Sequence, residues 1–142
     1  MDLTRDYETA ARLRRAVTRL HRRLRASALG GISPAQASML ASVENLESPT
    51  LGDLAVAEQI QPPSVTRLVQ AMEEAGLVAC APDSDDRRST RVRITPLGRR
   101  ELTSIRHRKT EFLERTLQTL SDVDRARARD LVTLLEYFVD QP

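Results

Sequence analysis

Apolar residues recur near every seventh position in the first part of the chain. Between residues 3 and 27 they form two neighbouring rows along one side of a helix. The rows are Leu3, Ala10, Val17 and Leu24, and next to them Leu13 and Leu20. This period predicts a long helix with a seam that packs against other helices. The segment ALGGI at 28–32 ends the helix, because adjacent glycines disfavour a helical backbone.

Two shorter helices follow, each marked by a capping sequence at its start. Ser33-Pro34 opens a helix that continues to about residue 46, and Gln36 completes the form of a capping box. Thr50 opens a brief third helix, TLGDLAVAEQI, in which Asp53 has the equivalent position. Apolar residues have helical spacing in both segments, and in the third helix they predict that Leu51, Leu54, Ala55 and Ile60 face inward.

The segment QPPSVTRLVQAMEEAG at 61–76 is predicted to be a separate helix after a short turn. Its two prolines suit a first helical turn, where their missing N–H groups would have had no partner, and Gly76 suits a helix end. The apolar stripe is Val65, Leu68, Val69 and Met72. The opposite face carries Ser64, Thr66, Arg67 and Gln70, which can hydrogen-bond to phosphates or base edges. Taken alone, this segment could equally be an ordinary surface helix.

After this helix the pattern changes from helical spacing to two extended runs. Residues 77–81 are a short apolar run, PDSDDRRS is a polar loop, and the residues from Thr90 to Thr95 alternate between apolar and charged side chains. The pattern predicts a β-hairpin. Two short helices joined by a turn and followed by a hairpin form a winged helix-turn-helix, whose second helix is placed to enter a DNA major groove.

Two long helices close the chain. The first is predicted to start at Thr95-Pro96 and the second at Ser121, and both carry apolar residues at helical spacing. The winged helix-turn-helix, which we call the reading unit, is too small to bury both helices. They therefore need a partner surface. The first helix of the same chain and of a second copy would supply it, which predicts a homodimer. We therefore expect one compact domain with a helical dimerisation region (1–32 and 97–142) and a DNA-binding region (33–96).

Composition and charge add to this picture. Aromatic residues make up 3% of the 142 residues, so burial must depend on Leu, Val, Ile and Ala. The net charge of +2 is small, but residues 1–31 carry eight arginines against three acids, and residues 32–58 carry four acids and no Lys or Arg. Charge is thus divided by segment. The arginines of the first helix are most simply a solvated face, and an approach to phosphates is the alternative.

Several classes of protein are disfavoured. No run approaches the roughly 18 apolar residues of a membrane span, and the charged N-terminus differs from a signal peptide, so we expect a cytoplasmic protein without a membrane partner. The single cysteine, Cys80, excludes an internal disulfide and a cysteine-rich metal site. His21 and His107 make no catalytic set with it, and there is no Gly-rich phosphate loop. We expect no enzyme activity, no cofactor and no metal.

Four longer motifs mark the chain: T-L-G-D-L-A in the third helix, P-S-V-T-R-L-V and M-E-E-A-G-L-V in the fourth, and D-S-D-D-R-R-S-T-R-V-R-I-T-P-L-G across the hairpin. Together they resemble the MarR family of bacterial winged helix-turn-helix regulators. The resemblance spans essentially the whole chain, and the hairpin run is its strongest part. It implies a mainly α fold with a small β-hairpin wing and long N- and C-terminal dimerisation helices.

The resemblance also implies a function. Members are homodimers that bind pseudo-palindromic double-stranded DNA, commonly as repressors, and many release it when a small, often aromatic effector binds between the dimer helices and the reading unit. The recognition helix, 62–75, would lie in the major groove and the wing, 82–91, at the minor groove, where a guanidinium suits the concentrated negative potential. The expected DNA contacts are Pro63, Ser64, Thr66, Arg67 and Gln70 in the helix and Asp86, Arg87, Arg88 and Arg91 in the wing.

Other interpretations stay open at this stage. Asp86 and Arg88 can form an ion pair that only stiffens the hairpin; we expect that to be the main role of Asp86, while Arg87 or Arg88 reaches DNA. DNA binding can be the output of a ligand or redox sensor tuned by the two histidines. Cys80 is more simply a small buried residue than a redox centre. A helical interaction protein with an incidental wing is a further alternative.

Overall fold

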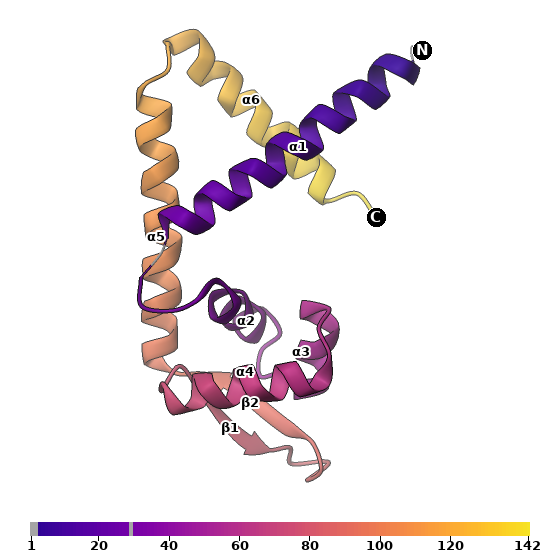
Figure 1. Cartoon of the computed structure of the whole chain (residues 1–142), viewed down its shortest axis with the longest axis vertical. Helices are drawn as coiled ribbons and strands as arrows, with labels where there is room; N and C mark the ends of the chain where they lie inside the picture. Colours follow the sequence, from indigo (N-terminus) through magenta and orange to yellow (C-terminus); the bar gives the residue numbers. More distant parts are fainter. Residues whose placement is uncertain (1–2, 29) are drawn as a thin grey trace.

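The computed structural model describes residues 3–28 and 30–142, which form six helices and one antiparallel hairpin (Figure 1). The helices are α1 (Leu3–Ser27), α2 (Pro34–Asn45), α3 (Leu51–Glu58), α4 (Pro62–Glu74), α5 (Pro96–Gln118) and α6 (Asp122–Val139). The strands are β1 (Val78–Pro82) and β2 (Thr90–Ile94). The predicted mainly α fold with a winged helix-turn-helix is confirmed. Leu29, in the predicted break after the first helix, lies outside the described residues.

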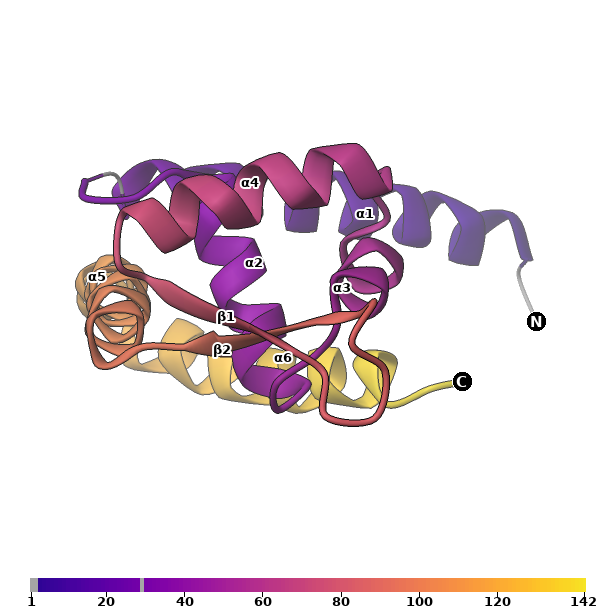
Figure 2. The ribbon, with the colours of Figure 1, turned by 90° about the horizontal axis from the view of Figure 1, so that it is seen from below.

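The elements form two parts at opposite ends of the molecule. α1 and α6 lie at one end with both chain termini, α3, α4 and the hairpin lie at the other, and α5 runs along one side between them (Figure 1). Seen from the hairpin end, α4 and the two strands are at the surface and α2 passes behind them (Figure 2). No helix in the described part of the chain is both long and apolar enough to span a membrane.

The helices start where the capping sequences predict. The side-chain oxygens of Ser33 and Thr50 accept hydrogen bonds from the N–H groups of Gln36 and Asp53, both at 3.1 Å. In return, the side chains of Gln36 and Asp53 accept from the N–H groups of Ser33 and Thr50, at 3.0 and 2.9 Å. Both predicted capping boxes are confirmed. They satisfy N–H groups that the first turn of a helix leaves without partners.

The core lies in the middle of the reading unit. Its largest fully buried side chains come from α2, α3, α4 and β2, and include Met39, Leu40, Val43, Leu54, Val65, Met72 and Val92. Leu77, Val78 and, from α5, Leu102 extend the same cluster. α1 and α6 contribute no buried residue in the part that the structure describes. The reading unit therefore has its own core, and the two terminal helices do not share it.

One inward-facing prediction is wrong. Ile60 was expected to pack inward from the third helix, but 36% of it is exposed. α3 ends at Glu58, and Gln59 adopts a left-handed conformation with φ of 55°. This turn directs the chain away from the helix before Ile60, so helical spacing no longer applies there.

Candidate DNA-binding surface

α4 has one buried face and one exposed face. Val65, Val69 and Met72 are at most 3% exposed and hold the helix on the core. All five residues predicted to contact DNA from this helix are exposed: Pro63, Ser64, Thr66, Arg67 and Gln70. The Thr66 hydroxyl donates to the carbonyl of Pro62 at 3.1 Å, which leaves its oxygen able to accept. The predicted polar residues are thus exposed on α4, which Figure 2 shows at the hairpin end of the molecule.

The turn between α3 and α4 sets the direction of α4. After the left-handed Gln59, the N–H of Ile60 donates to the carbonyl of Ala55 at 3.2 Å and closes α3. Gln61 is extended and its carbonyl accepts from the N–H of Ser64 at 2.9 Å, which starts α4. Both helices then bury side chains in the same core, so their relative orientation is held at the turn and at the core.

The wing tip carries an exposed ion pair. One carboxylate oxygen of Asp86 accepts from the N–H of Arg88 at 3.1 Å and from its Nε at 3.2 Å. The Arg88 side chain is 93% exposed. Such a pair contributes about 0–1 kcal/mol to stability. The hydrogen bonds are those expected if Asp86 orients the tip, and Arg87 beside it is also exposed.

Arg91, the fourth predicted wing residue, has contacts of a different kind. Its Nε donates to Asp83 at 3.1 Å, and its Nη1 donates to the carbonyl of Ser48 at 3.0 Å. The Arg91 guanidinium holds the pKa of the Asp83 carboxyl below its usual value. Ser48 lies in the turn between α2 and α3, far from the wing in sequence. Two nitrogens of Arg91, Nε and Nη1, thus have partners within the protein. That Arg91 contacts DNA stays a prediction.

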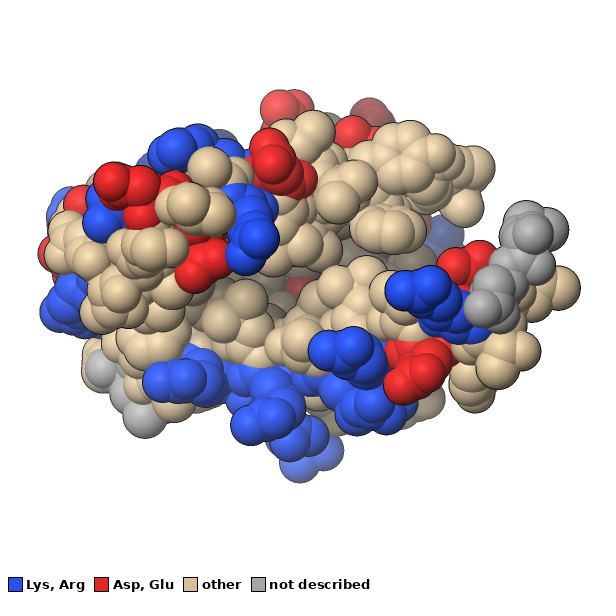
Figure 3. Space-filling model, turned by 90° about the horizontal axis from the view of Figure 1, so that it is seen from above, with Lys and Arg blue, Asp and Glu red and all other residues tan. Residues whose placement is uncertain are grey.

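Large apolar residues are exposed on α1 and α6. They are Leu3, Tyr7, Val17 and Leu20 on α1, and Val123, Leu131, Val132, Leu134, Tyr137, Phe138 and Val139 on α6. Figure 3 shows that Lys and Arg gather along α1, whereas residues that carry no charge line a hollow beside it. An exposed apolar surface of this extent is typical of a protein interface.

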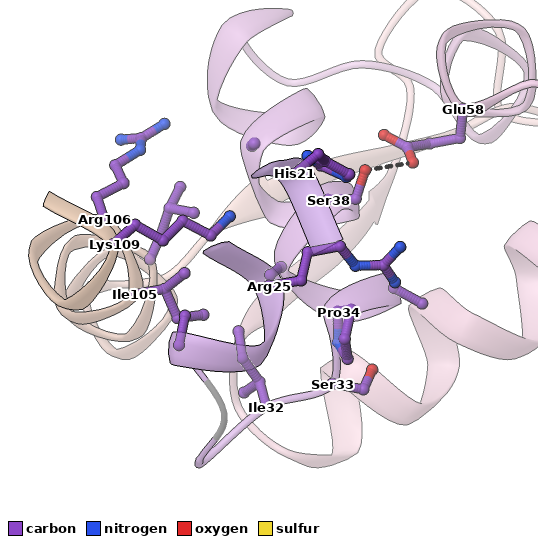
Figure 4. Close-up of a pocket in the computed structure, with 15 residues that line it drawn as sticks. His21, Arg25, Ile32, Ser33, Pro34, Ser38, Glu58, Ile105, Arg106 and Lys109 are labelled. Carbon is purple, nitrogen blue, oxygen red and sulfur yellow. Dashed lines mark hydrogen bonds between the residues drawn. The ribbon is translucent and has the colours of Figure 1, made fainter. Parts of the chain in front are cut away.

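A cavity of about 420 Å³ lies where α1, α2 and α5 meet. Its apolar lining includes Ile32, Ala37, Ala41, Leu102 and Ile105, and its basic lining is His21, Arg25, Arg106 and Lys109. Figure 4 shows Lys109 extending toward α1 while Arg106 points away. Arg106 is paired with Glu44 at 3.0 Å. Glu58 also lines the cavity, and both of its carboxylate oxygens accept from hydroxyls of α2, those of Ser38 and Ser42.

The comparisons with known proteins agree with this arrangement. Residues 32–90 match the model of the MarR family. An uncharacterized HTH-type transcriptional regulator of Mycobacterium bovis is 32% identical over 96% of both chains. A crystal structure described as a transcriptional regulator of Pseudomonas aeruginosa has a TM-score of 0.85 at 30% identity, and covers 97% of this chain and 98% of its own. A variant of Staphylococcus aureus MepR, solved with an oligodeoxyribonucleotide, shares the fold at a TM-score of 0.70 and 17% identity, with 93% and 98% covered.

The chain belongs to the MarR family of HTH-type transcriptional regulators. Its class is therefore that of DNA-binding regulators of transcription, and the similar proteins are also described as transcriptional regulators.

Two features were missed by the sequence analysis. The cavity depends on three helices that are distant in sequence. The link from Arg91 to Ser48 joins residues 43 positions apart, and no local pattern marks it. Cys80 lies in β1 as predicted, but it is half-buried where a buried residue was expected. Burial, together with a hydrogen bond to Glu73, raises the pKa of its thiol to about 11, which favours the unreactive protonated form.

Proposed function

We propose that the protein is a homodimeric, sequence-specific repressor that places α4 of each protomer in a DNA major groove and the wing at the neighbouring minor groove. The observation that carries the proposal is the exposed polar face of α4, held by a buried apolar face at the same end of the molecule as the wing. A helix in this position reads base edges, and flanking contacts to phosphates set its register.

The proposed contacts divide by chemistry. Arg67 and Gln70 can reach base edges, because guanidinium suits guanine and a carboxamide suits adenine. Ser64 and Thr66 suit phosphates near the first turn of α4, where Pro63 packs against the backbone of DNA. Arg88 and Arg87 reach into the minor groove from the wing, and Asp86 orients Arg88.

A homodimer is supported by the exposed apolar residues of α1 and α6. Burying them between two copies would remove them from water and would set the distance between two reading helices. In such a dimer the half-sites lie about one helical turn of DNA, roughly 34 Å, apart.

Binding-site selection from random duplex DNA tests this function directly. The expected result is an enriched palindrome whose half-sites are about 10 base pairs apart. Enrichment of a single unrepeated site would contradict the dimeric geometry, and no enrichment at low salt would contradict DNA reading. A reporter placed behind the selected site then separates a repressor from an activator.

The cavity between α1, α2 and α5 favours a second candidate function, control of DNA binding by a small organic anion. Its lining combines an apolar surface with Arg25 and Lys109, which have no ion-pair partner within the described residues. A volume of about 420 Å³ is in the range of small-molecule sites. The cavity also touches α2 and the end of α3, so an occupant would contact the elements that hold the reading helix.

Benzoate and its neutral analogue benzamide test this candidate. Benzoate is expected to raise the melting temperature of the protein and to change its affinity for the selected duplex, whereas benzamide is expected to do neither. Lys109→Gln should remove the benzoate effect. Equal responses to the two compounds, or none to either at millimolar concentration, would contradict an anion site.

A further inference from the structure

The contacts of Arg91 join the wing to the turn between α2 and α3. The guanidinium lies between Asp83, at the start of the wing loop, and the carbonyl of Ser48, in the turn between α2 and α3. The Asp83 side chain is only 13% exposed and that of Arg91 is 41% exposed. A partly buried, charge-assisted pair holds its geometry better than the exposed pair at the tip.

Backbone contacts at the same place add to the two side-chain contacts of Arg91, and we call the whole set the junction. The N–H of Val92 donates to the carbonyl of Pro49 at 2.9 Å, and Thr50 forms an isolated bridge with Arg91. Val92 itself is fully buried. The carbonyl that Arg91 binds belongs to a turn in which Glu47 and Ser48 both have positive φ, 51° and 66°. This conformation is uncommon for such residues, so an external hydrogen bond helps to hold the turn.

We infer that Arg91 and Asp83 are positioning residues that fix the angle between the wing and the helix-turn-helix, and that Arg91 acts on DNA through the wing. This inference rests on the proposed DNA-binding function. The wing loop projects past α3 and α4 (Figure 1), so a small rotation at its base moves Arg87 and Arg88 at its tip. The guanidinium at position 91 is needed because two separate nitrogens of one rigid group donate, Nε to a carboxylate and Nη1 to a carbonyl.

Asp83→Ala tests the inference, because two explanations predict opposite changes in the affinity for DNA. Asp83→Ala removes a negative charge near DNA, and general electrostatics then predicts tighter binding. Loss of the junction predicts weaker binding despite the more favourable charge. Asp85→Ala is the matched control, because Asp85 is an exposed acid of the same loop whose side chain has no hydrogen-bond or ion-pair partner among the described residues. It makes the same change of charge and leaves the junction intact.

The expected affinities are measured on the duplex recovered by site selection. Asp83→Ala and Arg91→Ala should each bind about fivefold more weakly than wild type, and the double variant no more weakly than either, because they break one junction. Asp85→Ala should bind equally or more tightly. Arg91→Lys keeps the charge, but its donors all lie on one nitrogen and cannot replace Nε and Nη1 at their separate positions, so it should bind more weakly than wild type. Asp83→Ala binding as tightly as Asp85→Ala, or Arg91→Lys binding like wild type, would overturn the inference.

Hydrogen–deuterium exchange on the free protein tests the junction without DNA and therefore independently of the proposed function. Residues 83–92 should exchange faster in Asp83→Ala and in Arg91→Ala than in wild type and Asp85→Ala, with the core of α2 and α4 unchanged. Equal exchange in all four proteins would overturn the junction even if DNA binding is confirmed. Wild-type protein that binds no duplex would overturn the DNA-binding function and the positioning role with it, whatever the exchange shows.

Discussion

The reading unit and the terminal helices bury their apolar residues in different ways. In the reading unit, Leu54 on α3 and Met72 on α4 are completely buried within one chain. On α6, Leu134 and Phe138 have helical spacing of the same kind, but 57% and 59% of them are exposed. An apolar stripe therefore shows that a helix has a face to bury, and the number of neighbouring elements in the chain decides whether one copy can bury it.

Because of this difference, we expect the reading unit and the terminal helices to contribute to function in different ways. The reading unit has a core that can hold the shape of the recognition helix within one protomer. In the proposed homodimer, the terminal helices would determine how two such units are spaced, because their apolar residues are exposed in one chain. Variants in the two regions are therefore expected to fail in different measurements.

The largest expected effect is on the stability of the reading unit. Leu54→Ala leaves a cavity at a fully buried position of α3 and should lower the free energy of unfolding by about 2–5 kcal/mol in urea titration. Val56→Ala, in the same helix at a residue that is 80% exposed, should change it by less than about 0.5 kcal/mol. Similar losses in both variants would mean that α3 does not pack as described.

The next effect concerns the terminal helices. Leu134→Glu would place a charge in the proposed dimer interface and should raise the dimer dissociation constant about a hundredfold or more, as measured by analytical ultracentrifugation. The reading unit should keep its helical circular dichroism. Thr133→Glu adds the same charge on another face of α6 and should leave the dimer intact; dissociation by both variants would point to charge alone and not to the apolar face.

Arg67→Ala should act on recognition alone. If Arg67 reads a base, affinity for the selected duplex falls by on the order of 1–3 kcal/mol and preference is lost at one operator position. Arg115→Ala, on the exposed part of α5, removes the same charge away from the reading face and should have a much smaller effect. An equal loss on selected and random duplexes would assign Arg67 to phosphate contact.

A smaller effect is expected at the capping box of α3. Thr50→Ala should lower the free energy of unfolding by about 1 kcal/mol. Thr50→Ser should lower it much less, because the serine hydroxyl can still cap the helix. The N–H and then the hydroxyl of Thr50 hold the pKa of Asp53 below its usual value of 3.8. Because this pKa is lowered, the Asp53 carboxylate makes its full contribution to the free energy of unfolding above pH 3.8. That contribution is lost as pH falls through the folded-state pKa. An unchanged difference between wild type and Thr50→Ala at lower pH would contradict this link.

The smallest effect should be at Cys80. With a pKa of about 11, on the order of one thiol in a thousand is ionised at pH 8. Alkylation by iodoacetamide should therefore be much slower than for free cysteine, and Cys80→Ala should leave DNA affinity unchanged. Fast alkylation of the folded protein, with release of DNA, would instead support the redox alternative.

Local sequence predicted most of the fold. Ser33 and Thr50 marked helix starts, and prolines and Gly76 bounded the recognition helix, because caps and breakers act within a few residues. The same locality explains the errors. Ile60 followed a helical spacing that ended at Gln59. The contact of Arg91 with Ser48 was not predicted, because the two residues are remote in sequence.

The apolar faces, the helix starts and the polar residues of the recognition helix were predictable from the sequence, since they follow from periodicity and from neighbouring residues. Three features became known only from the folded chain: which apolar faces one chain buries, the cavity between α1, α2 and α5, and the contact of Arg91 with the turn at Ser48. Those features depend on contacts between residues far apart in the chain, and such contacts leave no periodic signal in the sequence.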